Sequence, residues 1–555
     1  MGFSPVGRGR LATTAAAGAA ACTAVLLGLA AAGVLTWPTA LLLLAAAATV
    51  GASGAAALLA RRSERRTARL RTELEHDRKN HGKSRAAQQA RARAQQLFDD
   101  GRIQEAVDEV TPHAAHDEES ARQRARFVSM RRSLGPLPPL PEPPVVPQNA
   151  VPGRVLHVVT NALPRTQAGY TVRTQRILSA QRAIGLDAHA VTFAGYPTPK
   201  DKDRDTYTEV DGVPYHRVAP GQKFPGMFER IDASVDAVTA LARELRPAVL
   251  HAASGHKNAT IALNAGRALG IPVVYELRGL LEESWMARPG AHDRRASEWF
   301  RMTMQRETDL VREADAVVTL AETMRARILE RGVDPDRVYL APNAVDESLL
   351  SERPDGASFR AAHGIGQEEF VIGSVSSLHR YEGFGTLLEA AAFMRDRDRA
   401  VRVLLVGDGE DRDDLIALAD RLGIDDTCVF PGRVEPADAL RAQAALDAMV
   451  VPRLDTGVAR LVTPLKPVEA MAYGVPVVAS DLPALRELLA DGRAGTLVPP
   501  ADPAALAAAL IRLRKDDAYR EAQVAQALEE VRRFRTWPSV METYRQVYSR
   551  IGALD

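Results

Sequence analysis

Residues 464–481 carry the stretch from which the rest of the chain can be interpreted: Pro464-Leu-Lys-Pro-Val-Glu-Ala-Met-Ala-Tyr-Gly-Val-Pro-Val-Val-Ala-Ser-Asp481. Pro467 suits the first position of a helix, because proline has no N–H to leave unpaired there and its φ is already helical. Gly474 can adopt the left-handed conformation that ends a helix. The β-branched run over 475–479 is typical of a buried strand. The stretch therefore predicts a two-turn helix followed by a strand.

Two charged side chains make this predicted helix a candidate binding site. Lys466 lies at its start, where free backbone N–H groups attract anions, and Glu469, three residues further on, shares a face with Lys466. A cation beside free amides suits a diphosphate, and a neighbouring carboxylate can bind sugar hydroxyls, so the pair suits a nucleotide-sugar diphosphate. Alternatively Glu469 only caps the helix, although a capping box would place Ser or Thr at position 466. The local chemistry leaves both interpretations open.

The same stretch resembles the nucleotide-sugar motif of retaining GT-B glycosyltransferases of family 4. Its form, PLKP-x-EAMA-x-G, is the variant common among enzymes of exopolysaccharide and capsule assembly. Further matches follow in the family's order and cover about residues 153–550: Gly169-Tyr-Thr-Val-Arg-Thr174, Tyr275-Glu-Leu-Arg-Gly279, Pro342-Asn-Ala-Val-Asp346, Tyr381-Glu-Gly383 and Val406-Gly-Asp-Gly409. The resemblance implies an α/β fold of the GT-B type, in which two Rossmann-like domains face a cleft.

Length and composition agree with several domains and exclude some functions. A chain of 555 residues is too long for one hydrophobic core, so two or three domains are expected. A net charge of +1 argues against a nucleic-acid-binding protein. Cys22 and Cys428 are the only cysteines and lie far apart in the sequence, which argues against a disulfide framework or a cysteine-built metal site.

The N-terminal region, residues 1–60, predicts a transmembrane helical hairpin. Residues 11–60 contain no charged residue and no histidine. As one helix this run would be roughly 75 Å long, more than twice the ~30 Å apolar core of a bilayer. Trp37-Pro38-Thr39 offers the turn and an interfacial aromatic, so two spans are expected, about 11–35 and 40–60.

Arginines on both sides of the hairpin predict its orientation. Arg8 and Arg10 precede the first span, and Arg61 and Arg62 follow the second. Positive flanks stay in the cytoplasm, so we expect a multi-pass protein of the cell membrane with two spans and cytoplasmic catalytic domains. A cleaved signal peptide is the alternative, because alanine-rich segments offer many cleavage-like sites.

Residues 61–134 predict a basic helical stalk, and 135–152 a linker. Residues 61–93 hold twelve Lys and Arg against four Asp and Glu, so the segment either binds anionic headgroups or is a solvated helix beside the membrane. Residues 94–107 resemble one tetratricopeptide-like helix pair with Gly101 at its turn, and a single unit cannot bury a repeat core. Eight prolines in 135–152 make a stiff spacer.

The first Rossmann-like domain, the acceptor domain, is expected over residues 153–345. Buried-strand patterns alternate with helices there, which predicts a parallel sheet covered on both faces, with sites at the carboxyl ends of the strands. Gly169 and Tyr170 follow the first strand. The resemblance implies that this loop faces the donor phosphates and the acceptor, and that Arg173 reaches either of them. A solvent-facing arginine on an amphipathic helix is the alternative.

The segment that ends at Gly279 closes the fourth predicted strand of this domain. Relatives carry a histidine near the catalytic centre where this chain has Arg278. The resemblance to the variant subfamily implies that Glu276 and Arg278 take over its function, so both are expected to be catalytic together with Lys466. His251 and His256 close the preceding strand, and we expect structural roles for them.

The second Rossmann-like domain, the nucleotide-sugar domain, is expected over residues 346–515. Gly407 and Gly409 lie at a strand-to-helix turn, where glycine permits close approach of backbone to ligand. The resemblance implies that the segment ending at Arg433 holds the nucleotide base. Residues 516–555 predict helices that, by the resemblance, cross back to the first domain. Their aromatic residues are expected in the core: Trp537, Tyr544 and Tyr548.

Two departures from the family concern the donor site. Relatives carry an arginine and a lysine on the diphosphate where this chain has Ser377 and Glu382, and a first glutamate where it has Leu461. A bound diphosphate needs charge-assisted partners. The expected donor-binding residues are therefore Lys466, Glu469, Arg380, Arg453, Arg433, Gly407 and Gly409, with Arg460 as a further available cation.

The sequence as a whole predicts a membrane-tethered retaining glycosyltransferase. It would move a sugar from a nucleotide-diphosphate donor to a cell-envelope glycan or lipid-linked acceptor, and stabilise the leaving diphosphate by charge and helix-end amides. No cofactor or metal is expected, since no Asp-x-Asp motif lies at a strand end near the site. The alternative is an inactive glycosyltransferase-like scaffold of a polysaccharide assembly complex. An epimerase of the UDP-N-acetylglucosamine type is a third possibility that the motif does not favour.

Overall fold

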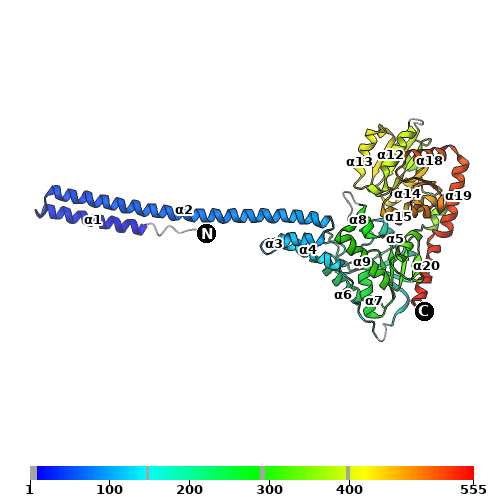
Figure 1. The fold of residues 1–555 in the computed structure, drawn as a ribbon, viewed down its shortest axis with the longest axis horizontal. Helices are drawn as coiled ribbons and strands as arrows, with labels where there is room; N and C mark the ends of the chain where they lie inside the picture. The colour runs from blue at the N-terminus through cyan, green and yellow to red at the C-terminus, as the bar shows by residue number, and fades with distance from the viewer. Residues whose placement is uncertain (1–8, 145–148, 288–293, 396–399, 555) are drawn as a thin grey trace. The chain divides into compact units, whose positions relative to one another are not determined.

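The computed structural model describes residues 9–144, 149–287, 294–395 and 400–554 (Figure 1). The chain divides into two compact units, Met1–Gln89 and Ala90–Asp555. The first unit contains α1 (Gly9–Ala31) and most of α2 (Trp37–Asp99). Figure 1 shows α1 running back along the first part of α2. The turn between them lies just before the predicted Trp37-Pro38-Thr39 break, because Pro38 fits the first turn of α2.

The predicted membrane spans over residues 11–60 are not supported. Within the ranges that the structure describes, neither α1 nor α2 nor any other helix combines the length and apolarity that crossing a membrane requires. The helical pair itself is present.

The end of α2 forms a small three-helix bundle with α3 (Ile103–Ala114) and α4 (Glu118–Leu134). Gly101 lies at the predicted turn with a φ of +78°, and Phe127 and Val110 are buried in the bundle core. This bundle docks on the first Rossmann-like domain, because Glu298 accepts hydrogen bonds from the Gln104 backbone at 2.7 Å and from Arg131 at 2.6 Å. Its helices therefore belong to the large compact unit, whereas the sequence predicted a stalk.

The first Rossmann-like domain has an eight-stranded sheet with the order β3-β4-β2-β1-β5-β6-β7-β8. All neighbouring strands pair in parallel except β3 and β4. The strands are β1 (Val151–Val159), β2 (Asp187–Thr192), β3 (Tyr207–Val210), β4 (Val213–Arg217), β5 (Pro247–Ala253), β6 (Val273–Leu277), β7 (Ala316–Thr319) and β8 (Val338–Leu340). The predicted linker therefore ends inside β1.

Helices cover both faces of this sheet, which explains why its strands are apolar almost throughout. The helices are α5 (Gly169–Ala183), α6 (Met227–Leu245), α7 (His256–Leu269), α8 (Leu281–Met286), α9 (Glu298–Glu313) and α10 (Glu322–Leu329). Helices α6, α7, α9 and α10 share a core with one face. The opposite face packs on α5 and on α20 (Trp537–Arg550).

The second domain has a six-stranded parallel sheet with the order β11-β10-β9-β12-β13-β14. Its strands are β9 (Phe370–Val375), β10 (Val401–Val406), β11 (Cys428–Gly432), β12 (Ala448–Val451), β13 (Val477–Ser480) and β14 (Thr496–Val498). Its helices are α11 (Gly356–Ala362), α12 (Phe384–Arg395), α13 (Arg412–Arg421), α14 (Pro436–Ala444), α15 (Gly457–Leu461), α16 (Lys466–Ala472), α17 (Pro483–Leu488) and α18 (Pro503–Lys515). They too lie on both faces, in two cores.

The chain ends with α19 (Asp517–Phe534), packed on the second domain, and α20, packed on the first. Trp537, Tyr544 and Tyr548 are buried, as the aromatic spacing predicted. Figure 1 shows α19 and α20 following one another along the side of both domains.

The loops that follow β6 and β12 meet between the two domains. Asn343 Nδ2 donates a hydrogen bond to the Thr463 carbonyl at 2.8 Å. A Cβ atom on Gly279 would lie 3.5 Å from the Val462 side chain, and Leu461 and Val462 pack against the first core. The carboxyl ends of the two parallel sheets, where α/β proteins bind ligands, thus come together.

Candidate active site

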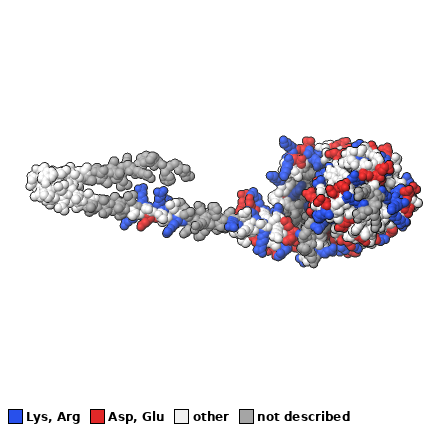
Figure 2. Space-filling model, turned by 90° about the horizontal axis from the view of Figure 1, so that it is seen from above, with Lys and Arg blue, Asp and Glu red and all other residues white. Residues whose placement is uncertain are grey.

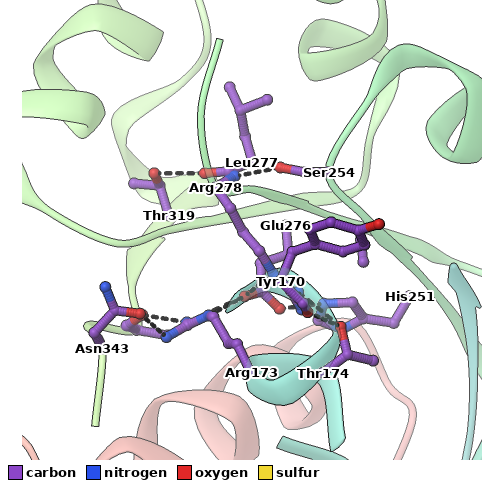
Figure 3. A network of polar contacts seen from close by, with 12 residues as sticks. Tyr170, Arg173, Thr174, His251, Ser254, Glu276, Leu277, Arg278, Thr319 and Asn343 are labelled. Carbon is purple, nitrogen blue, oxygen red and sulfur yellow. Dashed lines mark hydrogen bonds and ion pairs between the residues drawn. The ribbon is translucent and has the colours of Figure 1, made fainter. Parts of the chain in front are cut away.

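Glu276, the penultimate residue of β6, is fully buried beneath this meeting point and holds two arginines (Figure 3). Its Oε1 accepts hydrogen bonds from Arg278 Nε at 2.9 Å and from Arg173 Nη2 at 3.1 Å. Burial alone would raise the pKa of Glu276, but Arg278, Arg173 and the hydrogen bond from His251 together lower it well below its usual range. The carboxylate is therefore ionised at neutral pH and fixes both guanidinium groups.

The other carboxylate oxygen of Glu276 binds residues on the far side from the arginines. Oε2 lies 3.0 Å from His251 Nε2 and accepts a hydrogen bond from the Tyr544 hydroxyl, also at 3.0 Å. His251 Nδ1 lies 2.8 Å from the Tyr548 hydroxyl, and burial lowers the pKa of His251. These contacts of Glu276 are all internal, which fits a positioning role, and the catalytic role expected for it stays a prediction.

Arg278 follows β6. Of the two arginines that Glu276 binds, it is the one with an unused donor. Its backbone N–H donates to Ser254 Oγ at 2.6 Å, and its Nη1 donates to Thr174 Oγ1 at 2.8 Å (Figure 3). Its Nη2 is buried and has no hydrogen-bond partner among the described residues. Buried donors are nearly always paired, so this one is a strong candidate to bind a ligand oxygen. Gly279, the next residue, faces the second domain.

Arg173 has a different environment from the one expected. It is 3% exposed, and Nη1 donates to Asn343 Oδ1 at 2.9 Å while Nη2 donates to the Ala341 carbonyl at 2.7 Å. These bonds fasten α5 to the segment that connects the two domains. These contacts fit a structural role for Arg173, and its expected approach to the donor phosphates or the acceptor stays a prediction.

Gly169 and Tyr170 begin α5 at the edge of the first sheet. Tyr170 is 47% exposed, and its hydroxyl accepts a hydrogen bond from Asn161 Nδ2 at 2.9 Å. No atom would lie within 4 Å of a Cβ on Gly169, so the backbone is open at this point. Since the Tyr170 carbonyl also accepts from Arg278 Nη1 at 3.2 Å, this loop lies beside the candidate arginine.

Lys466 and Glu469 lie together at the start of α16, on the second domain. Their Nζ and Oε2 atoms are 3.6 Å apart, and Gln443 Nε2 donates to Glu469 Oε2 at 2.8 Å. Lys466 is the first residue of α16, so Pro467 takes the second position rather than the first. Both charged side chains are partly exposed, which leaves them accessible to a ligand.

Arg453, predicted to bind the donor, forms an ion pair with Glu382 instead. Nε and Nη2 donate to the two carboxylate oxygens at 3.0 and 2.9 Å, and Nη1 donates to the Val462 carbonyl at 2.8 Å. Both side chains are less than a tenth exposed. A buried ion pair therefore occupies the position at which the family resemblance implies a lysine.

The remaining predicted donor-binding residues are spread over the second domain. Arg380 is exposed, Arg433 is 82% exposed and lies 3.8 Å from Asp408, and Arg460 pairs with Asp455 at 2.8 Å. Of these cations Arg380 is the one for which the described structure shows no ion pair.

The two glycines after β10 are explained by the backbone beside them. A Cβ on Gly407 would lie 1.8 Å from the Ser376 carbonyl oxygen, and one on Gly409 would lie 2.3 Å from that of Leu378. Gly407 also has a φ of +137°, which disfavours other residues. Packing against the loop after β9 thus requires both glycines, whether or not a ligand binds there.

The sequence-based reasoning missed three residues that shape the site: Ser254, Thr174 and Gln443. Each binds a predicted residue through its side chain. Thr174 ends the quoted 169–174 motif, whereas Ser254 and Gln443 lie outside every quoted motif. The Glu382–Arg453 pair had a detectable signal, since an acidic residue in place of the family's lysine implies a compensating cation in a neighbouring loop.

The fold and the site define an α/β protein of the GT-B type. Residues 168–344 match the family described as "Glycosyl transferase 4-like domain", and residues 369–516 match "Glycosyl transferases group 1". The chain therefore carries these two glycosyltransferase domains, one after the other. The expected retaining mechanism and exopolysaccharide variant go beyond what these matches show.

Similar proteins agree with this assignment. The phosphatidyl-myo-inositol mannosyltransferase of Mycobacterium leprae (strain TN) is 35% identical over 211 residues, which are 38% of this chain and 53% of that protein. The D-inositol 3-phosphate glycosyltransferase of Thermomonospora curvata is 33% identical over 254 residues, 43% of this chain and 57% of that protein. The chain spans about half the length of the curated relatives it matches.

Solved structures share the fold. Sucrose-phosphate synthase from Thermosynechococcus elongatus has a TM-score of 0.60 at 18% identity and covers 72% of this chain and 100% of its own. Anabaena Alr3699/HepE in complex with UDP-glucose has a TM-score of 0.55 at 19% identity, with the same coverage. At these identities the likeness concerns the fold alone.

Proposed function

We propose that this protein is a retaining glycosyltransferase that transfers a sugar from a nucleotide-diphosphate donor to a cell-envelope glycan or lipid-linked acceptor. The observation that carries the proposal is the meeting of the loops after β6 and β12. A Cβ on Gly279, the residue after Arg278, would lie 3.5 Å from Val462 in the loop that leads into Lys466, and Arg278 has an unused donor. The two glycosyltransferase domain matches and the UDP-glucose complex of a structural neighbour support it.

The charged residues near this meeting of the two domains suit a reaction in which negative charge develops on a leaving diphosphate. The donor's bond between the anomeric carbon and the phosphate oxygen breaks, and the acceptor hydroxyl oxygen bonds to the same carbon on the same face. The hydroxyl proton passes to the departing phosphate oxygen. Lys466 and Arg278 stabilise the diphosphate by charge-assisted hydrogen bonds, while Glu469 binds donor hydroxyls. Glu276 keeps the guanidinium group of Arg278 oriented.

No cofactor and no divalent metal is part of the proposed reaction. Lys466, Arg278 and Arg380 supply the positive charge that a metal supplies in other sugar transferases. The test is a titration of the active enzyme with EDTA, in which undiminished turnover supports a metal-independent reaction and loss of turnover contradicts it.

An inactive scaffold of a polysaccharide assembly complex is the second candidate. The Glu382–Arg453 pair favours it, because a position that carries a free cation in relatives is neutralised here. A screen of nucleotide sugars that reports released nucleotide, with and without lipid extract, separates the two. Release from one donor supports the transferase, and no release from any donor, with intact nucleotide binding, supports the scaffold.

Membrane attachment of the enzyme is a proposal that rests on the sequence of residues 1–66 alone. Its uncharged run between arginines predicts two spans with both ends in the cytoplasm. Reporter fusions after residues 5 and 100 test it. Cytoplasmic signals from both, with the protein in the membrane fraction, agree with the hairpin. A chain processed after residue 30, or an external reporter at 100, contradicts it.

A further inference from the structure

A second pocket lies on the first domain, near the carboxyl end of β5 and beside α8. It has a volume of about 420 Å³, within the roughly 300–1,000 Å³ usual for small-molecule sites. Its apolar wall comes from the three-helix bundle and from the Trp285–Trp299 pair, and consists of Phe98, Met130, Leu134, Trp285 and Trp299. The bundle lies outside the two matched glycosyltransferase domains, so this pocket is a feature added to them.

Lys257, on the first turn of α7, gives the pocket a positive charge. No ion pair or hydrogen bond to its ammonium group occurs among the described residues. Burial, and to a smaller extent the nearby Arg230, lower its pKa. Two other charged residues line the pocket but are engaged elsewhere, since Asp99 accepts from Gln95 at 2.8 Å and Arg294 lies 3.5 Å from Asp100. The uncompensated charge is therefore that of Lys257.

His256 lines the same pocket and has unused hydrogen-bonding capacity. It is 3% exposed, and neither ring nitrogen has a hydrogen-bond partner in the described part of the chain. The nearest carboxylate, Glu307, is 4.0 Å from Nδ1, too far for a hydrogen bond. Burial lowers the pKa of His256 to about 3, so the ring is neutral and holds one unpaired N–H. Such orphaned groups are rare in protein interiors.

Residues of the pocket lie close in sequence to residues of the candidate active site, on the segments that follow β5 and β6. Ser254, two residues before His256, accepts the backbone hydrogen bond from Arg278. Leu281 and Ser284 of α8, which begins three residues after Arg278, line the pocket and are exposed. The pocket and the candidate active site therefore lie on neighbouring segments, those that follow β5 and β6.

We propose that this pocket binds a lipid phosphate, with its phosphate on Lys257 and His256 and its apolar chain against Phe98, Met130 and Trp299. An unpaired cation beside a neutral N–H suits a phosphate, and the aromatic and aliphatic wall suits the chain attached to it. The inference rests on the proposed function in one respect: the lipid phosphate is taken to be the part of the lipid-linked acceptor that carries the glycan. A free anion would leave the apolar wall unused, and an uncharged lipid would leave Lys257 unpaired.

Geranyl phosphate is the probe, because it carries a phosphate on a short apolar chain. Calorimetric titration of the full chain should show binding of geranyl phosphate that is at least tenfold tighter than that of geraniol or inorganic phosphate. Lys257→Gln should weaken geranyl phosphate by about ten- to a hundredfold, as loss of a charge-assisted bond does. Lys257→Arg should retain binding within a few-fold. Lys200→Gln, at an exposed lysine away from the pocket, is the matched control.

Each alternative outcome overturns the proposal. Equal binding of inorganic phosphate means a free-anion site, and equal binding of geraniol means an apolar site without phosphate recognition. Unchanged affinity in Lys257→Gln removes Lys257 from the site. Equal loss in Lys257→Gln and Lys257→Arg, with both folded by circular dichroism, means that its charge does not recognise the phosphate, which also refutes the proposal. The titration contains no sugar donor, so its result is independent of the transferase proposal. Release of nucleotide in the donor screen without geranyl phosphate binding would leave that proposal standing and this one refuted.

Discussion

The Tyr544 hydroxyl donates a hydrogen bond to Glu276 at 3.0 Å, although the two residues are 268 positions apart. Glu276 in turn fixes Arg278 through its Nε. The last helix of the chain, which begins after the second domain is complete, therefore supports the arginine that the first domain contributes to the candidate active site. The geometry of the candidate active site therefore depends on the C-terminal helix as well as on the first domain.

Tyr544→Phe should lower kcat several-fold while KM for the donor changes little. The substitution removes one of the hydrogen bonds that orient Glu276, and a hydrogen bond to a charged group contributes about 1.5–3 kcal/mol. Steady-state kinetics and urea unfolding measure the two effects. Tyr519→Phe is the control, since its hydroxyl bonds Thr496 within the second domain and its loss should affect stability alone. An unchanged kcat in Tyr544→Phe would show that Glu276 holds its arginines without this helix.

Arg278→Lys should lower kcat by about a hundredfold, the usual effect of removing one donor from a developing negative charge. Lysine keeps the charge but has no fork, so it cannot bind Glu276, Thr174 and a ligand at once. Turnover of the identified donor is the measurement. Arg402→Lys, which alters a comparable ion pair with Glu369 at the start of β10, should retain turnover. If both variants behave alike, Arg278 is a structural residue.

Lys466→Ala should weaken a nucleoside diphosphate by about ten- to a hundredfold and leave the nucleoside nearly unchanged, because only the former carries phosphate. Glu469→Gln should weaken both ligands equally, because both carry the ribose. Calorimetric titration of the two ligands against the two variants is the test. If Lys466→Ala weakens the nucleoside as much as the diphosphate, its role is to support the fold around α16.

Glu382→Gln should destabilise the protein by about 3–5 kcal/mol, because it leaves the buried Arg453 charge without its partner. The double variant Glu382→Leu with Arg453→Met should recover most of this loss, since replacing a whole buried pair by apolar residues is often neutral. Urea unfolding measures both. Nucleotide affinity should survive in the double variant, and its loss would mean that Arg453 contacts the donor after all.

In the parent protein the free energy of unfolding should fall as pH rises from about 4.5 to 7, and Glu307→Gln should abolish this fall. Burial and the charge of Glu282 raise the pKa of Glu307 from 4.5 to about 7, while the Tyr275 hydroxyl, Arg331 and the His256 N–H oppose this. The folded state thus binds the extra proton in that interval, and its stability falls as pH rises, by up to about 3 kcal/mol.

Urea unfolding of parent and variant at pH 5 and pH 8 measures this effect. The difference between the two proteins should favour the variant at pH 8 and shrink at pH 5. Glu389→Gln, at an exposed position on α12, should show no such dependence. A difference that stays constant with pH would place the pKa of Glu307 outside this range.

Local sequence patterns predicted the fold because each strand and helix carries its own signal. The fourth predicted strand, closed by the segment that ends at Gly279, is β6, and it places Arg278 at the sheet edge. Partners distant in sequence escaped prediction. The sequence around Arg173 is compatible with a surface arginine. Its partner Asn343 lies 170 residues away in the sequence and reaches the guanidinium group only in the folded chain. The bundle after residue 94 resembles a stalk until it docks on Glu298.

The α20 helix is synthesised last, although it belongs to the core of the first domain. Ribosomes release the first domain long before residues 537–553, yet those residues complete the core beneath β1, β5 and β7. The part of this face that α5 does not cover therefore stays apolar and exposed until synthesis has ended, and such surfaces are prone to aggregation. A product that stops short of Trp537 would keep this face exposed for its whole lifetime, which marks it for degradation even though both nucleotide-fold sheets are present.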